Sequence, residues 1–210
     1  MIVSTEPSTR RRDPEARPSQ ILDAAFKEFG ERGLAGARLD DIAKRAGVAK
    51  GTIYLYFPNK EALFREMVRV TIVDALQAAE TSRDDLGDEI SAREQLRLMA
   101  GAWWHHLRGE RQQVLTRVVH AELHRFPDLY AFYGQEVVAR GRRLVASVIA
   151  RGIARGEFRP IDPMVGARMY AALWMSHGAW CSARQIHPWL GSDDQVLDEM
   201  LEFFFHALTP

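Results

Sequence analysis

The sequence predicts an all-α protein, and three observations support this fold class. Apolar residues recur at helical spacing along nearly the whole chain, as Ile21, Ala25 and Phe29 do near its start. The sequence lacks alternating β-branched runs and Asn-Gly hairpin turns. With 210 residues, 47% of them apolar, the chain is long enough for one domain, or for a small domain joined to a larger one. The predicted helices span residues 18–32, 39–46, 50–57, 60–81, 91–107, 110–124, 127–155, 163–185 and 192–208.

Turn and capping residues delimit the first four helices. Gly33 follows the first helix, where a C-terminal glycine is common. Gly47 separates the second helix from the third and supplies the positive φ that a tight helix-to-helix turn favours. Pro58 ends the third helix, and Asn59 is a good N-cap for the long helix that begins at Lys60.

Similar signals delimit the later helices. Capping boxes occur at residues 91–94 and 192–195. Pro127 suits the first turn of its helix, and the Asp-Pro pair at residues 162–163 begins the next one. The acidic segment 82–89 separates two helices rather than two autonomous domains.

Composition excludes several classes of protein. The single Cys181 rules out an internal disulfide framework and is compatible with a reducing cytosol. No apolar run approaches the roughly 20 residues of a membrane span. The polar N-terminus lacks the apolar core of a signal peptide, so residues 1–17 are interpreted as a flexible arm. We therefore expect a cytoplasmic protein with no membrane partner.

Charge is distributed unevenly although the formal net charge is zero. Residues 1–70 hold 13 basic and 10 acidic side chains, and all four lysines fall within the first 60 residues. No acidic residue occurs between residues 42 and 60. This pattern indicates a negatively charged partner if the fold concentrates the charge on one face.

Residues 39–57 have the spacing of a helix-turn-helix. Ile42 and Ala46 share a face of the first helix, Ile53 and Phe57 share a face of the second, and Ala43 is small enough for the helices to cross closely. The exposed residues would contact DNA, with phosphate contacts giving position and contacts to base edges giving sequence preference. A surface helix with two core-facing tyrosines is the alternative. The exposed set comprises Lys50, Gly51, Thr52, Tyr54, Leu55 and Tyr56.

The segments "ILDAAFKEFGERGLAG" and "LDDIAKRAGVAKGTIYLYFPNKEALF" carry a family resemblance, together with the Tyr-x-Tyr-Phe block. Residues 18–66 resemble the DNA-binding domain of the tetracycline-repressor (TetR) family of bacterial regulators. The resemblance implies an all-α homodimer with three N-terminal helices on DNA. It also implies that residues 67–210 bind a small effector and form the dimer. The DNA-contacting residues implied by family position are Lys50, Gly51, Thr52, Tyr54, Leu55, Tyr56 and Lys60.

Two departures from the family pattern affect the expected interface. Ala37 and Arg38 precede the second helix, where the family commonly has threonines, so a hydroxyl cap worth about 1 kcal/mol is missing. Arg38 is instead a candidate phosphate contact. Leu55 occupies a position that is often aromatic or polar, and would read a thymine methyl. The predicted partner is a partly palindromic operator in double-stranded DNA.

The last two helices suggest an interface between two copies of the chain. The final helix carries two apolar rows, and three consecutive phenylalanines at 203–205 cannot all enter one core. One row would face its own domain and the other a partner chain, with purely internal packing as the alternative. The expected dimer interface comprises Met169, Ala172, Ser176, Ala179, Ala183, Val196, Met200, Phe203, Phe204 and Ala207.

All five tryptophans lie in the second half, where aromatic residues suit a pocket for a small, largely apolar or aromatic effector. The alternative is that these residues are simply core. The residues expected to line the pocket are Trp103, Trp104, Phe126, Tyr130, Tyr133, Tyr170, Trp174 and His177.

The histidines of residues 105–124 give the competing hypothesis, an all-α metal-binding protein or enzyme. His120 and His124 have the i, i+4 spacing of zinc ligands, but a third ligand is not evident. No nucleophile elbow, phosphate loop or His-Glu-x-x-His motif occurs, so we expect no enzyme, catalytic residue, metal or cofactor. The function predicted is a ligand-responsive DNA-binding transcriptional regulator, a repressor that its effector releases from the operator.

Overall fold

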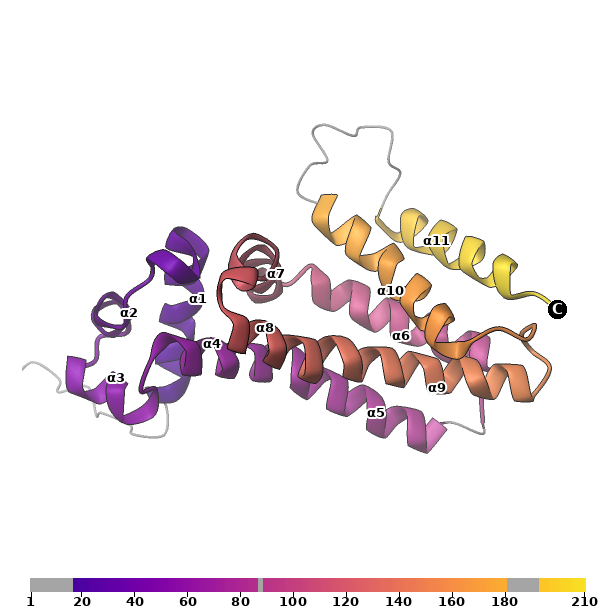
Figure 1. Ribbon diagram of the computed structural model, residues 1–210, viewed down its shortest axis with the longest axis horizontal. Helices are drawn as coiled ribbons and strands as arrows, with labels where there is room; N and C mark the ends of the chain where they lie inside the picture. Colours follow the sequence, from indigo (N-terminus) through magenta and orange to yellow (C-terminus); the bar gives the residue numbers. More distant parts are fainter. Residues whose placement is uncertain (1–16, 87–88, 181–192) are drawn as a thin grey trace, which may run out of the picture. The chain divides into compact units, whose positions relative to one another are not determined.

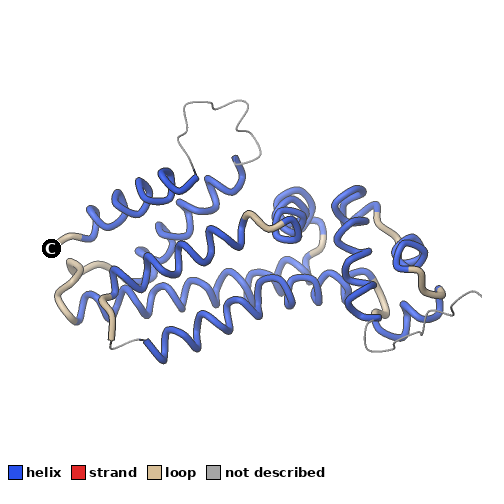
Figure 2. The backbone as a smooth tube through the Cα atoms, turned by 180° about the vertical axis from the view of Figure 1, so that it is seen from behind, coloured by secondary structure: helices blue, strands red, loops and turns tan. Residues whose placement is uncertain are grey.

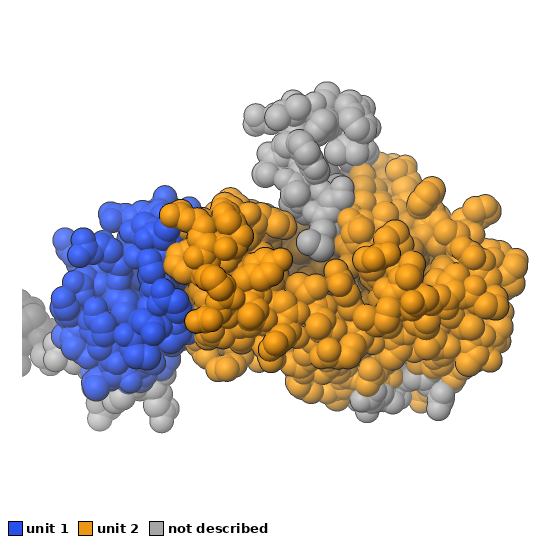
Figure 3. All heavy atoms as spheres, in the orientation of Figure 1, with its two compact units in different colours: residues 1–63 blue, residues 64–210 orange. Residues whose placement is uncertain are grey.

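The structure is a computed structural model that describes residues 17–86, 89–180 and 193–210 (Figure 1). In these ranges every regular element is a helix and none is a strand, which confirms the predicted fold class (Figure 2). The chain divides into two compact units, residues up to 63 and residues from 64 onward (Figure 3). The predicted arm lies outside the described residues apart from Arg17.

The first unit is built from α1 (Arg17–Gly36), α2 (Leu39–Ala46), α3 (Lys50–Tyr56) and the beginning of α4 (Lys60–Val68). Gly33 has φ 69° and ψ 174°, so α1 bends at the predicted stop and continues for a further turn. Its core holds apolar side chains from all three complete helices. The largest fully buried side chains of these helices are Ile21, Phe29, Leu34, Ile42 and Ile53.

The turn between α2 and α3 forms as its glycine predicts. Gly47 adopts the left-handed conformation with φ 69° and ψ 28°, which a residue with a Cβ rarely adopts. Its N–H donates to the carbonyls of Ala43 and Lys44, and the N–H of Val48 donates to the Ala43 carbonyl over 3.0 Å. These bonds close the end of α2 and turn the chain into α3.

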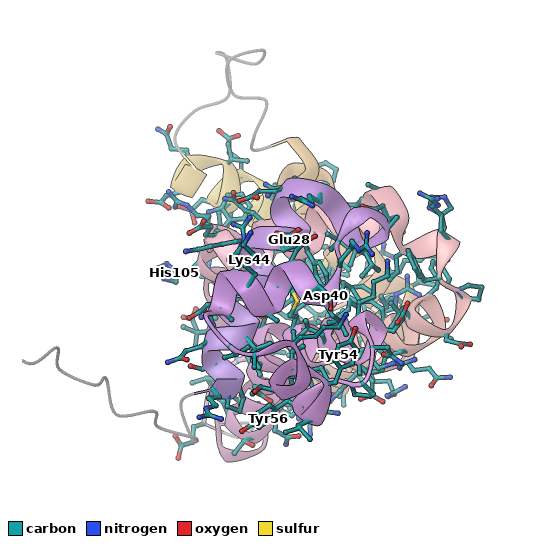
Figure 4. All side chains as sticks on the ribbon, turned by 90° about the vertical axis from the view of Figure 1, so that its left-hand side faces the viewer. Glu28, Asp40, Lys44, Tyr54, Tyr56 and His105 are labelled. Atoms are coloured by element: carbon teal, nitrogen blue, oxygen red, sulfur yellow. The ribbon has the colours of Figure 1, made fainter. Side chains whose placement is uncertain are left out.

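A buried carboxylate joins α1 to α2. Glu28, labelled in Figure 4, is only 1% exposed. Its carboxylate forms salt bridges of 3.1 Å with both Arg32 Nε and Arg45 NH2. Arg45 also contacts Glu31, and Arg32 contacts Asp41. Removing one partner of a buried ion pair leaves an uncompensated charge, so these groups hold α2 firmly against α1. Sequence reasoning missed this cluster, although Glu28 and Arg32 have i, i+4 spacing.

The second unit contains the rest of α4 and a bundle of longer helices (Figure 1). Its further elements are η1 (Arg69–Val73), α5 (Asp74–Leu86), α6 (Ala92–Leu107), α7 (Glu110–Glu122), η2 (Leu123–Arg125), α8 (Pro127–Tyr133), η3 (Gly134–Ala139), α9 (Arg140–Ala154), α10 (Pro163–Trp180) and α11 (Asp193–Leu208). Within these helices, the structure does not describe the side chains of residues 84–86, 174–180 and 193.

Two helices predicted as continuous are interrupted by π-helical turns. η1 interrupts the helix that begins at Lys60, and η3 interrupts the helix that begins at Pro127. The two turns pack against each other. π turns often occur at functional sites, and apolar periodicity does not reveal them. The predicted helix ending at residue 124 is also shorter, because α7 ends at Glu122 and a 3₁₀ turn follows.

The core of the second unit surrounds α9, which packs against α5, α6 and α10, while α6 also packs against α11. Leu96, Ile149 and Phe205 are buried in this core. The Ser91 Oγ accepts a 3.0 Å hydrogen bond from the Glu94 N–H, as the first capping box predicts. The second box begins at Ser192, which lies outside the described residues. No described helix is long and apolar enough to cross a membrane.

Candidate nucleic-acid interface and effector unit

The exposed face of α3 is opposite the side chain that holds the helix in the core. Ile53 is fully buried, and Leu55, two residues later, is 85% exposed. Because each residue turns a helix by about 100°, Gly51 and Leu55 share the face directed away from Ile53. Lys50 with Tyr54 forms one flank of this face, and Thr52 with Tyr56 forms the other.

Tyr54 and Tyr56 are exposed rather than core-facing, at 44% and 38% (Figure 4). This finding removes the alternative of a surface helix with two buried tyrosines. A Cβ built on Gly51 would meet no atom within 4 Å, so nothing inside the chain requires glycine there. The exposed face therefore combines the accessible backbone at Gly51, the apolar side chain of Leu55 at its centre and hydroxyl groups along both flanks.

Lys50, at the start of α3, is paired with an acidic residue of α2. Its Nζ donates to Asp40 Oδ2 over 2.8 Å, and this hydrogen bond raises the pKa of the Lys50 ammonium. The Lys50 side chain stays largely exposed, so the pair is a screened surface contact. A phosphate oxygen close to Lys50 would compete with Asp40 for the ammonium.

Arg38 and Lys60 lie at helix ends. Arg38 is the N-cap of α2 and makes no side-chain cap bond, as expected from the missing hydroxyl. Lys60 Nζ donates to the carbonyl of Ala35 over 3.0 Å, at the end of α1 where helix carbonyls need partners. Asn59 caps α4 as predicted, because its Oδ1 accepts from the Ala62 N–H over 2.7 Å. Lys60 thus has a structural contact that sequence reasoning did not foresee.

The aromatic residues proposed for an effector pocket have different surroundings. Trp104 and Tyr170 belong to the core of the second unit, and the Tyr170 hydroxyl donates to the Leu96 carbonyl over 2.8 Å. Burial raises the pKa of Tyr170. Trp103 packs against the edge of the same core and stacks on His106, with ring centroids 5.4 Å apart.

The other proposed pocket residues come from α8 or lie just before it. Tyr130 is 62% exposed, while Phe126 and Tyr133 are half-buried. Burial raises the pKa of Tyr133 to about 12. Trp174 and His177 lie in α10, but their side chains are outside the described set. The pocket that these aromatic residues were predicted to line therefore stays a prediction.

The histidines of the competing hypothesis do not converge. His105, His120 and His124 are exposed, and α7 ends before His124, which breaks the i, i+4 spacing. His106 Nε2 hydrogen-bonds to Gln112 Oε1 over 3.1 Å, and burial lowers the pKa of its imidazole. The described residues contain no group of three His, Cys, Asp or Glu side chains able to hold a metal ion.

The residues proposed for a dimer interface divide into two sets. Val196 and Phe204 are buried in the core of their own chain, so they do not form an exposed partner surface, and Met200 is half-buried. Met169, Ala172, Phe203 and Ala207 are exposed. Ser176 and Ala179 lie in α10 without described side chains, and Ala183 lies outside the described residues.

A helix-turn-helix with an exposed second helix, followed by a larger helical unit, defines a DNA-binding transcriptional regulator. Comparison with known proteins identifies the family. Residues 21–67 match the model of "Bacterial regulatory proteins, tetR family", and residues 86–187 match "Tetracyclin repressor-like, C-terminal domain". The chain belongs to the TetR family, whose regulators bind DNA operators and small-molecule effectors as dimers.

Named relatives cover both units. The fatty acid metabolism regulator protein of Bacillus subtilis is 31% identical over 144 residues, which are 67% of this chain and 70% of that protein. The crystal structure of the transcriptional regulator FadR from B. subtilis in complex with stearoyl-CoA matches with a TM-score of 0.73 and 25% identity, over 90% of this chain and 98% of that one.

A second solved structure gives a similar match. Native NalD, the secondary repressor of the MexAB-OprM multidrug efflux pump in Pseudomonas aeruginosa, has a TM-score of 0.76 and 26% identity. The match covers 94% of this chain and 98% of that chain. One of these two structures is a transcriptional regulator in complex with stearoyl-CoA and the other is a repressor, so the comparisons favour the regulator over the metal-binding or enzymatic alternative.

Proposed function

We propose that this protein represses transcription by binding a partly palindromic operator as a homodimer and leaves the operator when a small effector binds the second unit. The observation that carries this proposal is the exposed α3 face, with Leu55 at its centre and hydroxyl and ammonium groups on its flanks. That mixture suits the major groove, where base edges and thymine methyl groups lie between phosphates. Such a regulator would act in the cytoplasm, where its operator lies.

The DNA contacts divide by chemistry. Leu55 and Thr52 would contact base edges, and Tyr54 and Tyr56 would donate their hydroxyl groups to the backbone or to bases. Gly51 would let the helix backbone approach the groove closely. Lys50, Arg38 and Lys60 would contact phosphates, and Lys50 would exchange Asp40 for a phosphate oxygen.

A dimer would form through the exposed apolar residues of α10 and α11. Phe203 is 74% exposed, and Ala207 lies one turn further along the same helix. On the flank of α11 that faces α6, Arg97 forms salt bridges with Asp198 and Glu202. A second copy would cover the other flank, because a single chain gains little by leaving a phenylalanine in water.

The effector is proposed to be small and largely apolar or aromatic. The matched FadR structure contains stearoyl-CoA, whose acyl chain is apolar, and this supports an apolar effector for the related chain. Of the two tryptophans on α6 that are proposed to line the pocket, Trp103 is more accessible than Trp104. The aromatic residues that line the pocket remain a proposal.

Selection of bound duplexes from random oligonucleotides, followed by footprinting, tests the DNA part of the proposal. The expected footprint has two half-sites that face successive major grooves on one side of the DNA. A Leu55→Glu, Tyr56→Ala variant should lose the footprint, whereas Leu98→Glu, which changes another exposed leucine, on α6, should keep it. Tight binding of a monomer to one half-site would contradict the proposal.

Tryptophan emission tests the effector part, because all five tryptophans lie between residues 103 and 189. A true effector should change this emission and weaken DNA binding over the same concentration range. Linkage requires DNA to weaken the effector by the same factor, typically about 5–150-fold. A ligand that saturates the emission change and leaves DNA bound is not the signal.

A further inference from the structure

A polar cavity lies between α5 and α9 and has a volume of about 350 Å³. Its lining includes three arginines and one glutamate, and the single aliphatic residue is Leu144. The lining therefore carries two more positive than negative formal charges. An apolar effector would find little to contact here. The residues that line the cavity are Gln77, Glu80, Thr81, Arg83, Arg140, Arg143 and Leu144.

One wall of the cavity is formed by the ion pair of Arg140 and Glu80, whose charges cancel. Arg140 donates from Nε to Glu80 Oε1 over 2.7 Å and from NH2 to Glu80 Oε2 over 2.6 Å. Its NH2 also donates to Gln77 Oε1 over 2.5 Å. The hydrogen bond from Arg140 lowers the pKa of Glu80, so this carboxylate stays ionised and Arg140 stays in place.

The other two arginines of the lining are Arg83 on α5 and Arg143 on α9. Arg83 NH1 donates to Ser147 Oγ over 3.1 Å, a neutral partner that directs the guanidinium from α5 toward α9. Arg143 is exposed, and its guanidinium forms no hydrogen bond or salt bridge with any side chain that the structure describes. The Thr81 hydroxyl adds a further polar group to the lining of the cavity.

We propose that this cavity binds a small anion that carries phosphate or carboxylate groups, at a site separate from the apolar effector pocket. Guanidinium groups recognise both kinds of anion through paired N–H donors, and no described side chain accepts from the donors of Arg143. The cavity volume is at the small end of the range for ligand sites, which fits an anion the size of pyrophosphate or citrate. A bound anion would join α5 to α9 through Arg83 and Arg143.

Isothermal titration calorimetry on the full chain, in a chloride buffer at constant ionic strength, tests this site with pyrophosphate and citrate as separate probes. Saturable binding of either probe with a Kd of about 1 mM or below is the expected result. Stronger binding of pyrophosphate identifies a phosphate ligand, and stronger binding of citrate identifies a carboxylate ligand. The absence of binding by both overturns the proposal.

Matched variants separate this cavity from other basic surfaces, including the DNA-binding face. Arg143→Gln should weaken the preferred probe about 10-fold, the loss expected for one charge-assisted contact. Arg143→Lys, which keeps the charge without the paired donors, should fall between that variant and the unchanged protein. Arg117→Gln, a change of an exposed arginine on α7, should bind as the unchanged protein does. Unchanged binding by Arg143→Gln would also overturn the proposal.

Discussion

The exposed apolar side chains of α3 and those of α10 and α11 differ in their neighbours. Leu55 on α3 lies between rows that carry Lys50 and Tyr54 on one side and Thr52 on the other. Phe203 on α11 shares its face with Ala207, and the exposed Met169 on α10 shares its face with Ala172. Exposure alone does not distinguish the two surfaces. Hydroxyl and ammonium groups suit α3 to DNA, whereas the apolar Met200 and Ala207, one turn before and after Phe203, suit its face to a second copy of the chain.

The largest effect is expected from a charge on the α11 surface. Phe203→Glu should convert a dimer into monomers, because the carboxylate would be buried without a partner. Loss of an interface hot spot costs at least about 2 kcal/mol, so operator affinity should fall by at least about 30-fold. Sedimentation and operator titration measure the two outcomes.

A matched leucine gives the control for this substitution. Leu98→Glu places the same charge on an exposed position of α6 and should leave the oligomeric state unchanged. If Phe203→Glu remains a dimer with full operator affinity, the apolar patch of α11 is not the interface.

The next effect concerns base preference. Leu55→Ala should reduce discrimination at one base pair of each half-site by about 1–3 kcal/mol while leaving the salt dependence of binding unchanged. The free energy of unfolding should not change, since the Leu55 side chain is 85% exposed. Titrations against operators with single base-pair changes measure this effect. Equal weakening on every operator would assign Leu55 to a role other than base reading.

Two lysines that differ in their contacts should separate stability from DNA binding. Lys60→Ala should lower the free energy of unfolding by about 1 kcal/mol, because the hydrogen bond from Lys60 Nζ to the Ala35 carbonyl is lost. It should also flatten the log–log salt dependence of DNA binding by about one unit. Lys50→Ala should change only the salt dependence, since its partner Asp40 is on the surface. An unchanged slope for Lys60→Ala would remove Lys60 from the DNA contacts.

The smallest expected effect is a dependence of the stability of the second unit on pH. All seven histidines lie in the second unit, and burial lowers the pKa of His106 below its usual 6.5. The unfolded chain therefore binds this proton more readily, so the contribution of His106 to stability is present above about pH 6.5 and is lost as the pH falls through the folded pKa. Chemical denaturation followed by tryptophan emission, at several pH values, should show this loss. His106→Gln should show a flatter pH profile, and an equally steep profile would exclude His106 as its source.

The first unit was largely predictable because its signals are local. Gly47, Asn59 and Ile53 act through turns, caps and spacing within a few residues, and all three lie as expected. The burial of Glu28 was missed, because its ion pairs depend on Arg45, which a different helix supplies. The contact of Lys60 with Ala35 likewise joins residues far apart in sequence.

The helices of the second unit were predictable from the sequence, but the neighbours of its side chains were not. Of the two apolar rows of α11, the one with Leu201, Phe204 and Leu208 enters its own core, as periodicity suggests for one row. Periodicity does not say which neighbour an aromatic side chain meets, so it could not separate the buried Trp104 from the exposed Tyr130. The basic cavity between α5 and α9 was missed for the same reason, since its residues come from segments about sixty positions apart.

The π-helical turns set the rotational phase of the helices that follow them. A turn closed from residue i to i+5 holds one residue more than an α-helical turn, and one residue corresponds to about 100° around the helix axis. Beyond η1, Leu76 is directed toward α9, where its Cδ2 would lie 3.7 Å from a Cβ on Gly141. Deleting one residue from 69–73 would keep α5 helical and rotate its whole surface away from α9. The number of residues in segment 69–73 therefore determines which face of α5 packs against α9.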